Sequence, residues 1–382
     1  MDYYETVDAA NKANESEFGY EAFVPYFDEE EDECCHGDHH HHHHHHDGEC
    51  CGGHDDGCCH DGECDECDDE CCGGHDDGEC CGRHRHWHNP AFATFTFAHE
   101  GANYFVRRWG KPGDVPVLML HGFMQTGDSW WQIAPAIAQD RCVYAMDLLG
   151  HGKSDKPADV SAYSLEGAAA AAHALIREVI QPEAEAANPG RKHKVHLVGY
   201  SLGGRVALTL LARAGGDLNT VVLESSSLGP ADEQEAQTVA SRNQEWAAKL
   251  RNEGMQSFVD FWEQLPLFQT QQRLAASKRG KAQRAERMSQ DPQAMAAVLL
   301  GMGLPTMPLK AESKDMLACC WNPVCYVYGN RDEKYAALAH DFVHEGFEAR
   351  GIMAGHNSHF ENPDTYVAEL DNILRGNEMR GI

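Results

Sequence analysis

The chain has 382 residues, enough for one large or two average domains, and a formal net charge of −30. Residues 1–88 carry −24 of this charge, because 27 acidic residues there face only Lys12, Arg83 and Arg85. The remainder carries about −6, an ordinary balance for an enzyme. Since a phosphate backbone requires a basic face, the composition predicts no nucleic-acid partner.

The sequence pattern predicts neither a membrane span nor a secretory signal. No apolar run approaches the roughly 20 residues of a membrane span. The N-terminus, Met-Asp-Tyr-Tyr-Glu, lacks the basic and apolar regions of a secretory signal. We therefore expect a cytoplasmic protein with reduced thiols and no membrane span. The oligomeric state cannot be inferred from the sequence.

The N-terminal quarter has the composition of a tail. Residues 1–33 are acidic with scattered aromatic side chains and no sustained period, which predicts a mobile segment or at most a short docking segment. Residues 34–88 contain almost no aliphatic side chains and cannot bury a core, so we expect a disordered, acidic, Cys/His-rich tail. This part holds twelve of the sixteen cysteines, eight consecutive histidines, and the repeat Glu-Cys-Cys-Gly-Gly-His-Asp-Asp-Gly at 49–57 and 70–78.

Metal binding is the chemistry that such a tail favours. Thiolate and imidazole suit Zn²⁺, Ni²⁺ or Cu⁺, and the spacings indicate several weakly bound or clustered ions rather than one tetrahedral site. The alternative is a solvated acidic tail whose histidines come from a cloning tag, although cysteines flank the histidines on both sides. The candidate ligands are Cys50, Cys51, His54, Cys64, Cys67, Cys71, Cys72 and His75.

From residue 91 to about 378 the pattern is that of a folded domain. Alternating residues at 92–97 and 103–109 predict a β-hairpin, and later apolar runs suit a buried parallel sheet with helices between its strands. The predicted strands are Val115–Leu120, Cys142–Met146, Lys194–Val198, Thr220–Leu223, Val324–Tyr328 and Ala349–Met353. The predicted helices include Leu165–Ile180, Leu202–Ala214, Lys334–His344 and Pro363–Leu374.

This alternation of strands and helices predicts βαβ units with right-handed crossovers, and so an α/β fold with a mostly parallel sheet. Residues 230–318 interrupt it, because they are rich in Gln, Ala, Arg and Met and show no strand pattern. We expect this insertion to form a helical cap over the site.

A G-x-S-x-G motif at 199–203 follows a predicted strand and opens a predicted helix, which is the context of a nucleophile elbow. The serine of an elbow occupies a strained turn, and its flanking glycines let neighbouring backbone pass closely. A glycine-rich loop is the alternative, but it does not account for the strand and helix. We therefore predict an α/β-hydrolase fold with Ser201 as nucleophile.

The acid and the base of this fold follow the nucleophile in the order Asp or Glu, then His, each after a late strand. Asp332 and His356 fit that order. His356 would take the proton of Ser201, and Asp332 would hold the imidazole in the required tautomer. Glu333 and His359 are the alternatives, although packing or a supporting hydrogen bond suits His359 better.

The oxyanion hole requires two backbone amides. We expect one from Leu202, directly after the nucleophile at a helix N-terminus, and the other from Phe123, after the strand Val117–Leu120. Asp147 follows the next strand but lies outside the order of the triad. We expect it to bind loop amides in a structural turn.

Five motifs together identify a narrower resemblance. They are His-Gly-Phe at 121–123, Asp-x-x-Gly-His-Gly-x-Ser at 147–154, Gly-Tyr-Ser-Leu-Gly-Gly-Arg at 199–205, Arg-Asp-Glu-Lys-Tyr at 331–335 and Gly-His-Asn-x-His-x-Glu-Asn-Pro at 355–363. Over about Val117 to Leu374 the chain resembles the 2-succinyl-6-hydroxy-2,4-cyclohexadiene-1-carboxylate synthase family of menaquinone biosynthesis.

The resemblance implies a lyase that needs no cofactor. Ser201, activated by His356, would remove a proton from 2-succinyl-5-enolpyruvyl-6-hydroxy-3-cyclohexene-1-carboxylate, and pyruvate would then be expelled. Because this small-molecule partner is a polycarboxylate, arginines are expected in the pocket. The substrate-binding residues that the resemblance implies are Tyr200, Arg205, Trp262 and Arg287, the last placed either in the pocket or on the surface of a cap helix.

One position departs from the family pattern. Family members carry a further arginine where this chain has Val239. Either Arg242 takes its place or the pocket has one cation fewer.

Two other functions are kept as alternatives. A serine esterase or carbon–carbon bond hydrolase would share the triad and differ in whether the pocket is cationic. A metal-buffering protein, acting through residues 1–88, would not depend on Ser201 at all.

Overall fold

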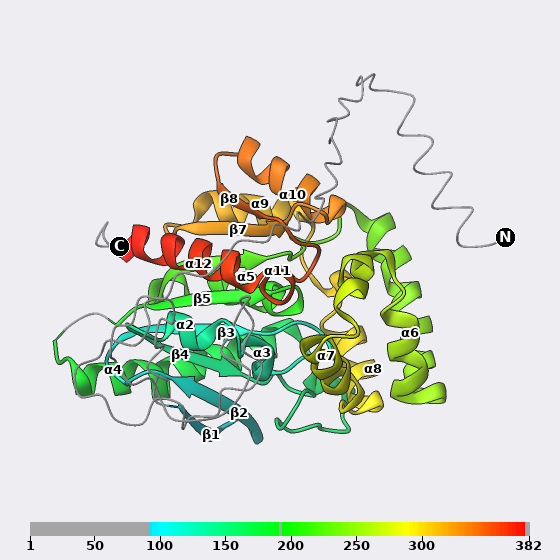
Figure 1. The fold of residues 1–382 in the computed structure, drawn as a ribbon, viewed down its shortest axis with the longest axis horizontal. Coiled ribbons are helices and arrows are strands. Elements are labelled where there is room, and N and C mark those ends of the chain that lie inside the picture. The colour runs from blue at the N-terminus through cyan, green and yellow to red at the C-terminus, as the bar shows by residue number, and fades with distance from the viewer. Residues whose placement is uncertain (1–91, 191–192, 379–382) are drawn as a thin grey trace, which may run out of the picture. The chain divides into compact units, whose positions relative to one another are not determined.

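The computed structural model describes residues 92–190 and 193–378, which form one eight-stranded sheet flanked by helices (Figure 1). The strand order is β1-β2-β4-β3-β5-β6-β7-β8. β2 pairs antiparallel with β1 and with β4, and the other pairs are parallel. The strands are β1 (Phe92–His99), β2 (Ala102–Trp109), β3 (Val115–Leu120), β4 (Arg141–Met146), β5 (Val195–Tyr200), β6 (Leu218–Glu224), β7 (Val324–Gly329) and β8 (Glu348–Ile352). The predicted hairpin and parallel sheet are confirmed, with strand ends shifted by no more than two residues.

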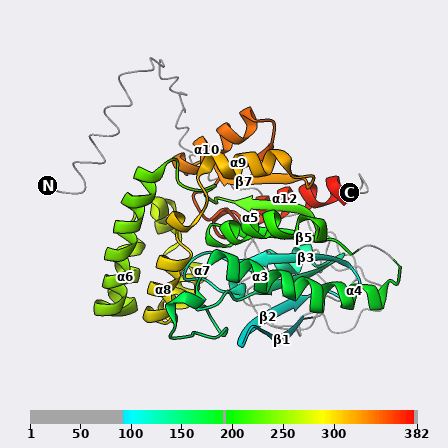
Figure 2. The same cartoon turned by 180° about the vertical axis from the view of Figure 1, so that it is seen from behind.

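The alternation of side chains along each strand divides the core into two layers. Leu118 and Leu120 of β3 pack on one face of the sheet, whereas Val117 and Met119 pack on the other. The first face is covered by α3 (Leu165–Leu175) and α5 (Leu202–Ala214), and the second by α2 (Ala134–Ile137) and α12 (Pro363–Glu378). α12 lies nearer the viewer in Figure 1, and α3 and α5 do so in Figure 2.

The predicted helix Leu165–Ile180 is longer and less regular than expected. α3 passes into a π-helical turn, η3 (Ile176–Ile180), and then into α4 (Gln181–Ala187). Pro182 in the first turn of α4 has no N–H to continue the α-helical hydrogen bonds, which accounts for the local widening. Outside the cap, the short helical elements η1 (Gly127–Trp130), η2 (Val160–Ala162), η4 (Gly215–Asp217) and α11 (Ser358–Glu361) and the longer helix α10 (Glu333–His344) complete the fold.

The cap, residues 233–319, lies between β6 and β7. It consists of α6 (Glu233–Trp262), η5 (Pro266–Leu274), α7 (Lys278–Met288), α8 (Pro292–Gly301), η6 (Leu304–Thr306) and α9 (Lys310–Cys319). α6 bends at Gly254, whose φ of 78° is readily adopted only by glycine. Figure 1 shows α6, α7 and α8 together at one end of the sheet. Within the described ranges, no helix is long and apolar enough to cross a membrane.

The parallel strands bring the predicted site together. The loops that follow β3, β5, β7 and β8 leave the sheet at its carboxyl edge, where open α/β sheets bind ligands. Residues from the cap and from these loops line one cavity at this edge.

Candidate active site

Ser201 occupies a tight turn between a strand and a helix. β5 ends at Tyr200 and α5 begins at Leu202, so Ser201 alone forms the turn. Its φ of 50° and ψ of −104° lie where non-glycine residues are rare, at a cost of about 1–3 kcal/mol. A Cβ on Gly203 would lie 2.2 Å from the Leu120 carbonyl oxygen. This close approach of α5 to β3 holds Ser201 at the sheet edge and explains the glycine.

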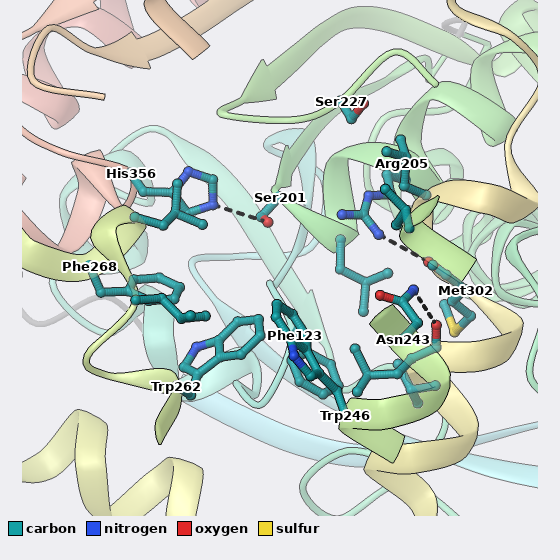
Figure 3. A pocket seen from close by; sticks show the side chains of 18 of the residues that line it. Phe123, Ser201, Arg205, Ser227, Asn243, Trp246, Trp262, Phe268, Met302 and His356 are labelled. Carbon is teal, nitrogen blue, oxygen red and sulfur yellow. Dashed lines mark hydrogen bonds between the residues drawn. The ribbon is translucent and has the colours of Figure 1, made fainter. Parts of the chain in front are cut away.

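Ser201, His356 and Asp332 form one chain of hydrogen-bonding contacts. His356 Nε2 lies 3.3 Å from Ser201 Oγ (Figure 3), and His356 Nδ1 lies 2.7 Å from Asp332 Oδ2. An Nδ1–H that donates to the carboxylate leaves Nε2 unprotonated and able to accept the Ser201 proton. The structure therefore brings the three predicted catalytic residues together.

The base and its carboxylate are shielded from water. The side chains of His356 and Asp332 are 2% and 3% exposed. Asp332 also caps α10, because its Oδ1 accepts a hydrogen bond of 3.3 Å from Tyr335 N. The rings of Tyr335 and Phe268 lie 4.8 Å and 5.8 Å from the imidazole, between centroids. Exclusion of water strengthens the electrostatic interaction of the pair.

Neither alternative residue lies in this chain of contacts. Glu333 is exposed at the start of α10. His359 instead contacts Glu224, with its Nδ1 2.7 Å from Oε2.

The loop after β3 is folded back on itself next to the cavity. Gln125 N donates to Gly122 O at 3.3 Å, and Gly122 N donates to Gln125 Oε1 at 3.0 Å. Met124, with a φ of 58°, lies within this turn. Phe123 and Leu202 both line the cavity, and their backbone amides donate no hydrogen bond to any residue of the described ranges. Both amides therefore remain able to donate to an oxyanion.

Asp147 stabilises the end of this loop through hydrogen bonds. It accepts hydrogen bonds from Gly127 N at 2.7 Å and Lys153 N at 2.9 Å, as the predicted structural turn requires. It also accepts from Arg107 Nη1 at 2.6 Å, and both side chains are buried. The strand pattern around Arg107 gives no sign of this partner, which sequence reasoning missed.

A cavity of about 150 Å³ adjoins Ser201. All four predicted substrate-binding residues line it: Tyr200, Arg205, Trp262 and Arg287. In Figure 3, Arg205 and Met302 lie on one side of Ser201, and His356 and Phe268 lie on the other. Phe123, Trp246 and Trp262 form an aromatic wall, with 5.3 Å between the ring centroids of Phe123 and Trp262.

The cavity is cationic. Arg205, Arg242, Arg287 and Lys334 line it, and none of its described lining residues is Asp or Glu. Arg205 Nη1 donates to Met302 O at 3.2 Å, whereas its Nε is buried with no hydrogen-bond partner in the described part of the chain. Burial lowers the pKa of the Arg205 guanidinium, because desolvation disfavours the charge. An anionic ligand would offset that cost.

Arg287 belongs to the cavity rather than to the surface. It is 5% exposed, and its guanidinium lies 5.3 Å from the ring centroid of Phe268. Nη1 lies 3.0 Å from Glu263 Oε1, and Nη2 lies 3.2 Å from Gln271 Oε1. These contacts hold the guanidinium in one orientation.

Val239 and Arg242 both line the cavity, one turn of α6 apart. Arg242 Nη2 donates to Asn243 Oδ1 at 3.2 Å, and its guanidinium lies 4.4 Å from the ring centroid of Trp246. The first cap helix therefore still supplies a cation to the cavity. Lys334, which the sequence showed only as part of a motif, is a further cation at the same cavity.

The eight predicted metal ligands, from Cys50 to His75, lie outside the described residues. Between residues 92 and 378, as far as the structure describes them, no cluster of three or more His, Cys, Asp or Glu side chains is arranged to bind a metal ion.

Comparison with known proteins defines the class first. Residues 115–363 match the family model for the alpha/beta hydrolase fold, in agreement with the sheet order and the elbow. The chain is therefore an α/β-hydrolase-fold protein, and the predicted fold class is confirmed.

Comparison with individual relatives identifies a narrower family within this fold. The 2-succinyl-6-hydroxy-2,4-cyclohexadiene-1-carboxylate synthase of Enterobacter sp. (strain 638) is 32% identical over 271 residues, which cover 70% of this chain and 95% of that protein. The structure of MenH from S. aureus has 25% identity and a TM-score of 0.62, covering 72% of this chain and 98% of that one. A thermophilic esterase from Thermogutta terrifontis, with 22% identity, a TM-score of 0.59, and coverage of 75% and 98%, shares the fold. The chain belongs to the 2-succinyl-6-hydroxy-2,4-cyclohexadiene-1-carboxylate synthase family, as its motifs predicted.

Proposed function

We propose that this protein eliminates pyruvate from 2-succinyl-5-enolpyruvyl-6-hydroxy-3-cyclohexene-1-carboxylate to give 2-succinyl-6-hydroxy-2,4-cyclohexadiene-1-carboxylate. The observation that carries the proposal is a serine–histidine pair at a cavity with four cations and no carboxylate among its described lining residues. A serine esterase or carbon–carbon bond hydrolase would use the same triad. The charge of the cavity favours the lyase, because its substrate carries several carboxylates.

In this reaction Ser201 Oγ removes a proton from the substrate ring while His356 Nε2 accepts the hydroxyl proton. The C–H electron pair enters the ring as the existing double bond shifts, and the ring C–O bond to the enolpyruvyl group breaks. The leaving enolpyruvate keeps the electron pair of that bond and takes up one proton to become pyruvate. The amides of Phe123 and Leu202 would stabilise negative charge that develops on a carboxylate or carbonyl oxygen.

The arginines would hold the substrate for this step. A guanidinium can bind a carboxylate through two parallel hydrogen bonds, which fixes orientation as well as position. Arg205 lies on the helix that Ser201 precedes, and Arg242 and Arg287 approach from the cap. Substrate carboxylates bound by Arg205 from the core and by Arg242 and Arg287 from the cap would place the ring between Ser201 and the aromatic wall.

Pyruvate release, coupled to lactate dehydrogenase, tests the proposal. We expect fast release by the wild type from the enzymatically prepared precursor. Loss in Ser201→Ala and Arg205→Ala, with retention after removal of residues 1–88, would establish the lyase and leave the tail as a separate module. A folded wild type that releases no pyruvate but turns over p-nitrophenyl acetate steadily would instead establish the hydrolase.

We also propose that the Cys/His-rich tail, residues 34–88, binds soft or borderline metal ions such as Zn²⁺, Ni²⁺ or Cu⁺. Its support is the repeated pairing of cysteines with histidines. Equilibrium dialysis of the full chain and of a chain lacking residues 1–88 against Zn²⁺ should show binding only in the former. Unchanged pyruvate release after EDTA treatment would agree with catalysis that needs no cofactor. The cytoplasmic location stays a prediction.

A further inference from the structure

The cap helix α7 is bonded to the loop that carries the Phe123 amide. Glu286 of α7 accepts two hydrogen bonds at Oε1, from Thr126 N at 2.8 Å and from Thr126 Oγ1 at 2.5 Å. Thr126 lies three residues after Phe123, at the end of the turn closed by Gly122 and Gln125. The cap therefore contacts the backbone of this loop and does not only cover it.

The residue after Thr126 is held by the other part of the fold. Gly127 N donates to Asp147 Oδ1, and Asp147 follows β4 of the sheet. Two consecutive amides are thus bound by carboxylates from the cap and from the core. The contact with Asp147 fixes Gly127 at the end of the loop. The contact with Glu286 then determines the position of Thr126, and through it the path of the backbone back to Phe123.

The same turn of α7 also faces the substrate cavity. Arg287 lines the cavity, while Glu286 beside it binds Thr126. Glu286 and Arg287 belong to the same turn of α7. A movement of α7 that brings Arg287 into contact with a substrate carboxylate therefore also moves Glu286 relative to the loop.

We propose that Glu286 is a positioning residue for the oxyanion hole, and that α7 couples a substrate carboxylate at Arg287 to the placement of the Phe123 amide. The inference rests on the proposed roles of Ser201 and Phe123, and it does not depend on which substrate is used. Both hydrogen bonds end on a single oxygen of Glu286. Glutamine can therefore reproduce them, whereas alanine and leucine cannot.

The rate of Ser201 phosphonylation by a fluorophosphonate probe tests this, because it requires the nucleophile and the oxyanion hole but no pyruvate chemistry. We expect Glu286→Ala and Glu286→Leu to slow phosphonylation and to lower kcat for pyruvate release by roughly 10- to 100-fold, with a smaller change in KM. Glu286→Gln should stay within about threefold of the wild type in both measurements.

Gln290→Ala is the matched control. Gln290 lies one turn further along the chain, where its Oε1 accepts from Gly152 N at 3.0 Å and its Nε2 donates to the backbone carbonyl of Glu286 at 3.1 Å. It therefore ties the end of α7 to a core loop without a hydrogen bond to the Glu286 carboxylate or to the loop of Phe123, and its loss controls for loosening of this end of the helix. We expect it to react like the wild type, with thermal midpoints recorded for every variant. Wild-type rates in folded Glu286→Ala or Glu286→Leu, equal slowing in Gln290→Ala, or no rescue by glutamine would overturn the inference. Phosphonylation without pyruvate release in the wild type would overturn only the proposed function, and the comparison of variants would still decide the role of Glu286.

Discussion

His359 is bound to Glu224 through both its ring and its backbone, although it stands only three residues from His356. Its Nδ1 lies 2.7 Å from Glu224 Oε2, and its backbone N donates to Oε1 at 3.1 Å. The two side chains are 1% and 0% exposed, and the imidazole stacks on Trp130 at 4.2 Å between centroids. The second histidine of the motif therefore joins the last loop of the sheet to the end of β6.

Replacement of His359 should lower the free energy of unfolding and should have little effect on pyruvate release by the protein that remains folded. His359→Ala leaves the Glu224 carboxylate buried without its main partner, and we expect a loss of about 3–5 kcal/mol in the free energy of unfolding. His356→Ala also removes the imidazole partner of a buried carboxylate, Asp332, so stability should fall there too; but it should abolish pyruvate release in the folded protein, whereas folded His359→Ala should retain it. Urea denaturation and the lactate dehydrogenase assay separate the two effects. Stable, inactive His359→Ala would show instead that this histidine acts in the reaction.

Arg242, the cation supplied by the first cap helix, should lower KM for a polycarboxylate substrate and should not affect KM for a neutral ester. Charge-assisted hydrogen bonds contribute about 1.5–3 kcal/mol each, so Arg242→Leu should raise KM by roughly 10- to 150-fold. Arg251→Leu, an exposed position on the same helix, is the control and should leave KM unchanged. An equal KM for Arg242→Leu and the wild type would place the substrate carboxylates elsewhere in the cavity.

The half-buried carboxylate of Glu286 predicts a pH dependence of stability. Burial raises its pKa to about 7, with Asp128 adding to the increase and the hydrogen bonds from Thr126 and the charge of Arg287 opposing it. A carboxyl with a raised folded-state pKa binds more protons folded than unfolded. Its contribution to stability therefore falls as pH rises from its unfolded pKa of about 4.3 to about 7, and is flat above that.

Glutamine at position 286 removes this titration. The thermal midpoint of the wild type, measured relative to Glu286→Gln, should fall between about pH 5 and about pH 7 and then stay constant. Parallel curves for the two proteins over this range would show that Glu286 titrates with an ordinary pKa.

Gly203 should not tolerate a side chain. A Cβ there would lie 2.2 Å from Leu120 O and 2.7 Å from His121 O, so α5 or the loop after β3 must shift. We expect Gly203→Ala to cost about 1–3 kcal/mol and to lower kcat, because the displaced loop carries the Phe123 amide. Gly376→Ala is the control, since no atom lies within 4 Å of its Cβ and the residue is in helix α12. Calorimetry should show that variant to be as stable as the wild type or slightly more so.

The sequence was sufficient for the features that depend on local pattern. Apolar runs between helices predicted the parallel sheet, and the glycines around Ser201 predicted the elbow. Chain order then predicted which Asp and His would meet the serine. The end of β5 was placed too early, at Val198, because glycine disfavours strands; in the structure Gly199 and Tyr200 still pair with β6.

Features that depend on packing between distant segments were not predictable. Glu286 and Thr126 are 160 residues apart, and Arg107 and Asp147 are 40 apart. The sequence of α7, Lys-Arg-Gly-Lys-Ala-Gln-Arg-Ala-Glu-Arg-Met, is polar on nearly every side, so no apolar stripe indicates which side is buried. Pocket and surface were therefore equally plausible for Arg287 until the helix was placed against its neighbours.

The tryptophans of the aromatic wall should report ligand binding through their intrinsic fluorescence. Trp246 and Trp262 meet edge to face at 5.6 Å, and both line the cavity beside Ser201. Indole emission responds to polarity and charge near the ring, so an anion that enters the cavity should change intrinsic fluorescence before any bond is broken. Trp321 is 97% exposed and is not among the residues that line the cavity, so its emission should stay open to quenching by iodide when a ligand is bound. Ligand entry and turnover can therefore be timed separately in stopped-flow experiments without a label.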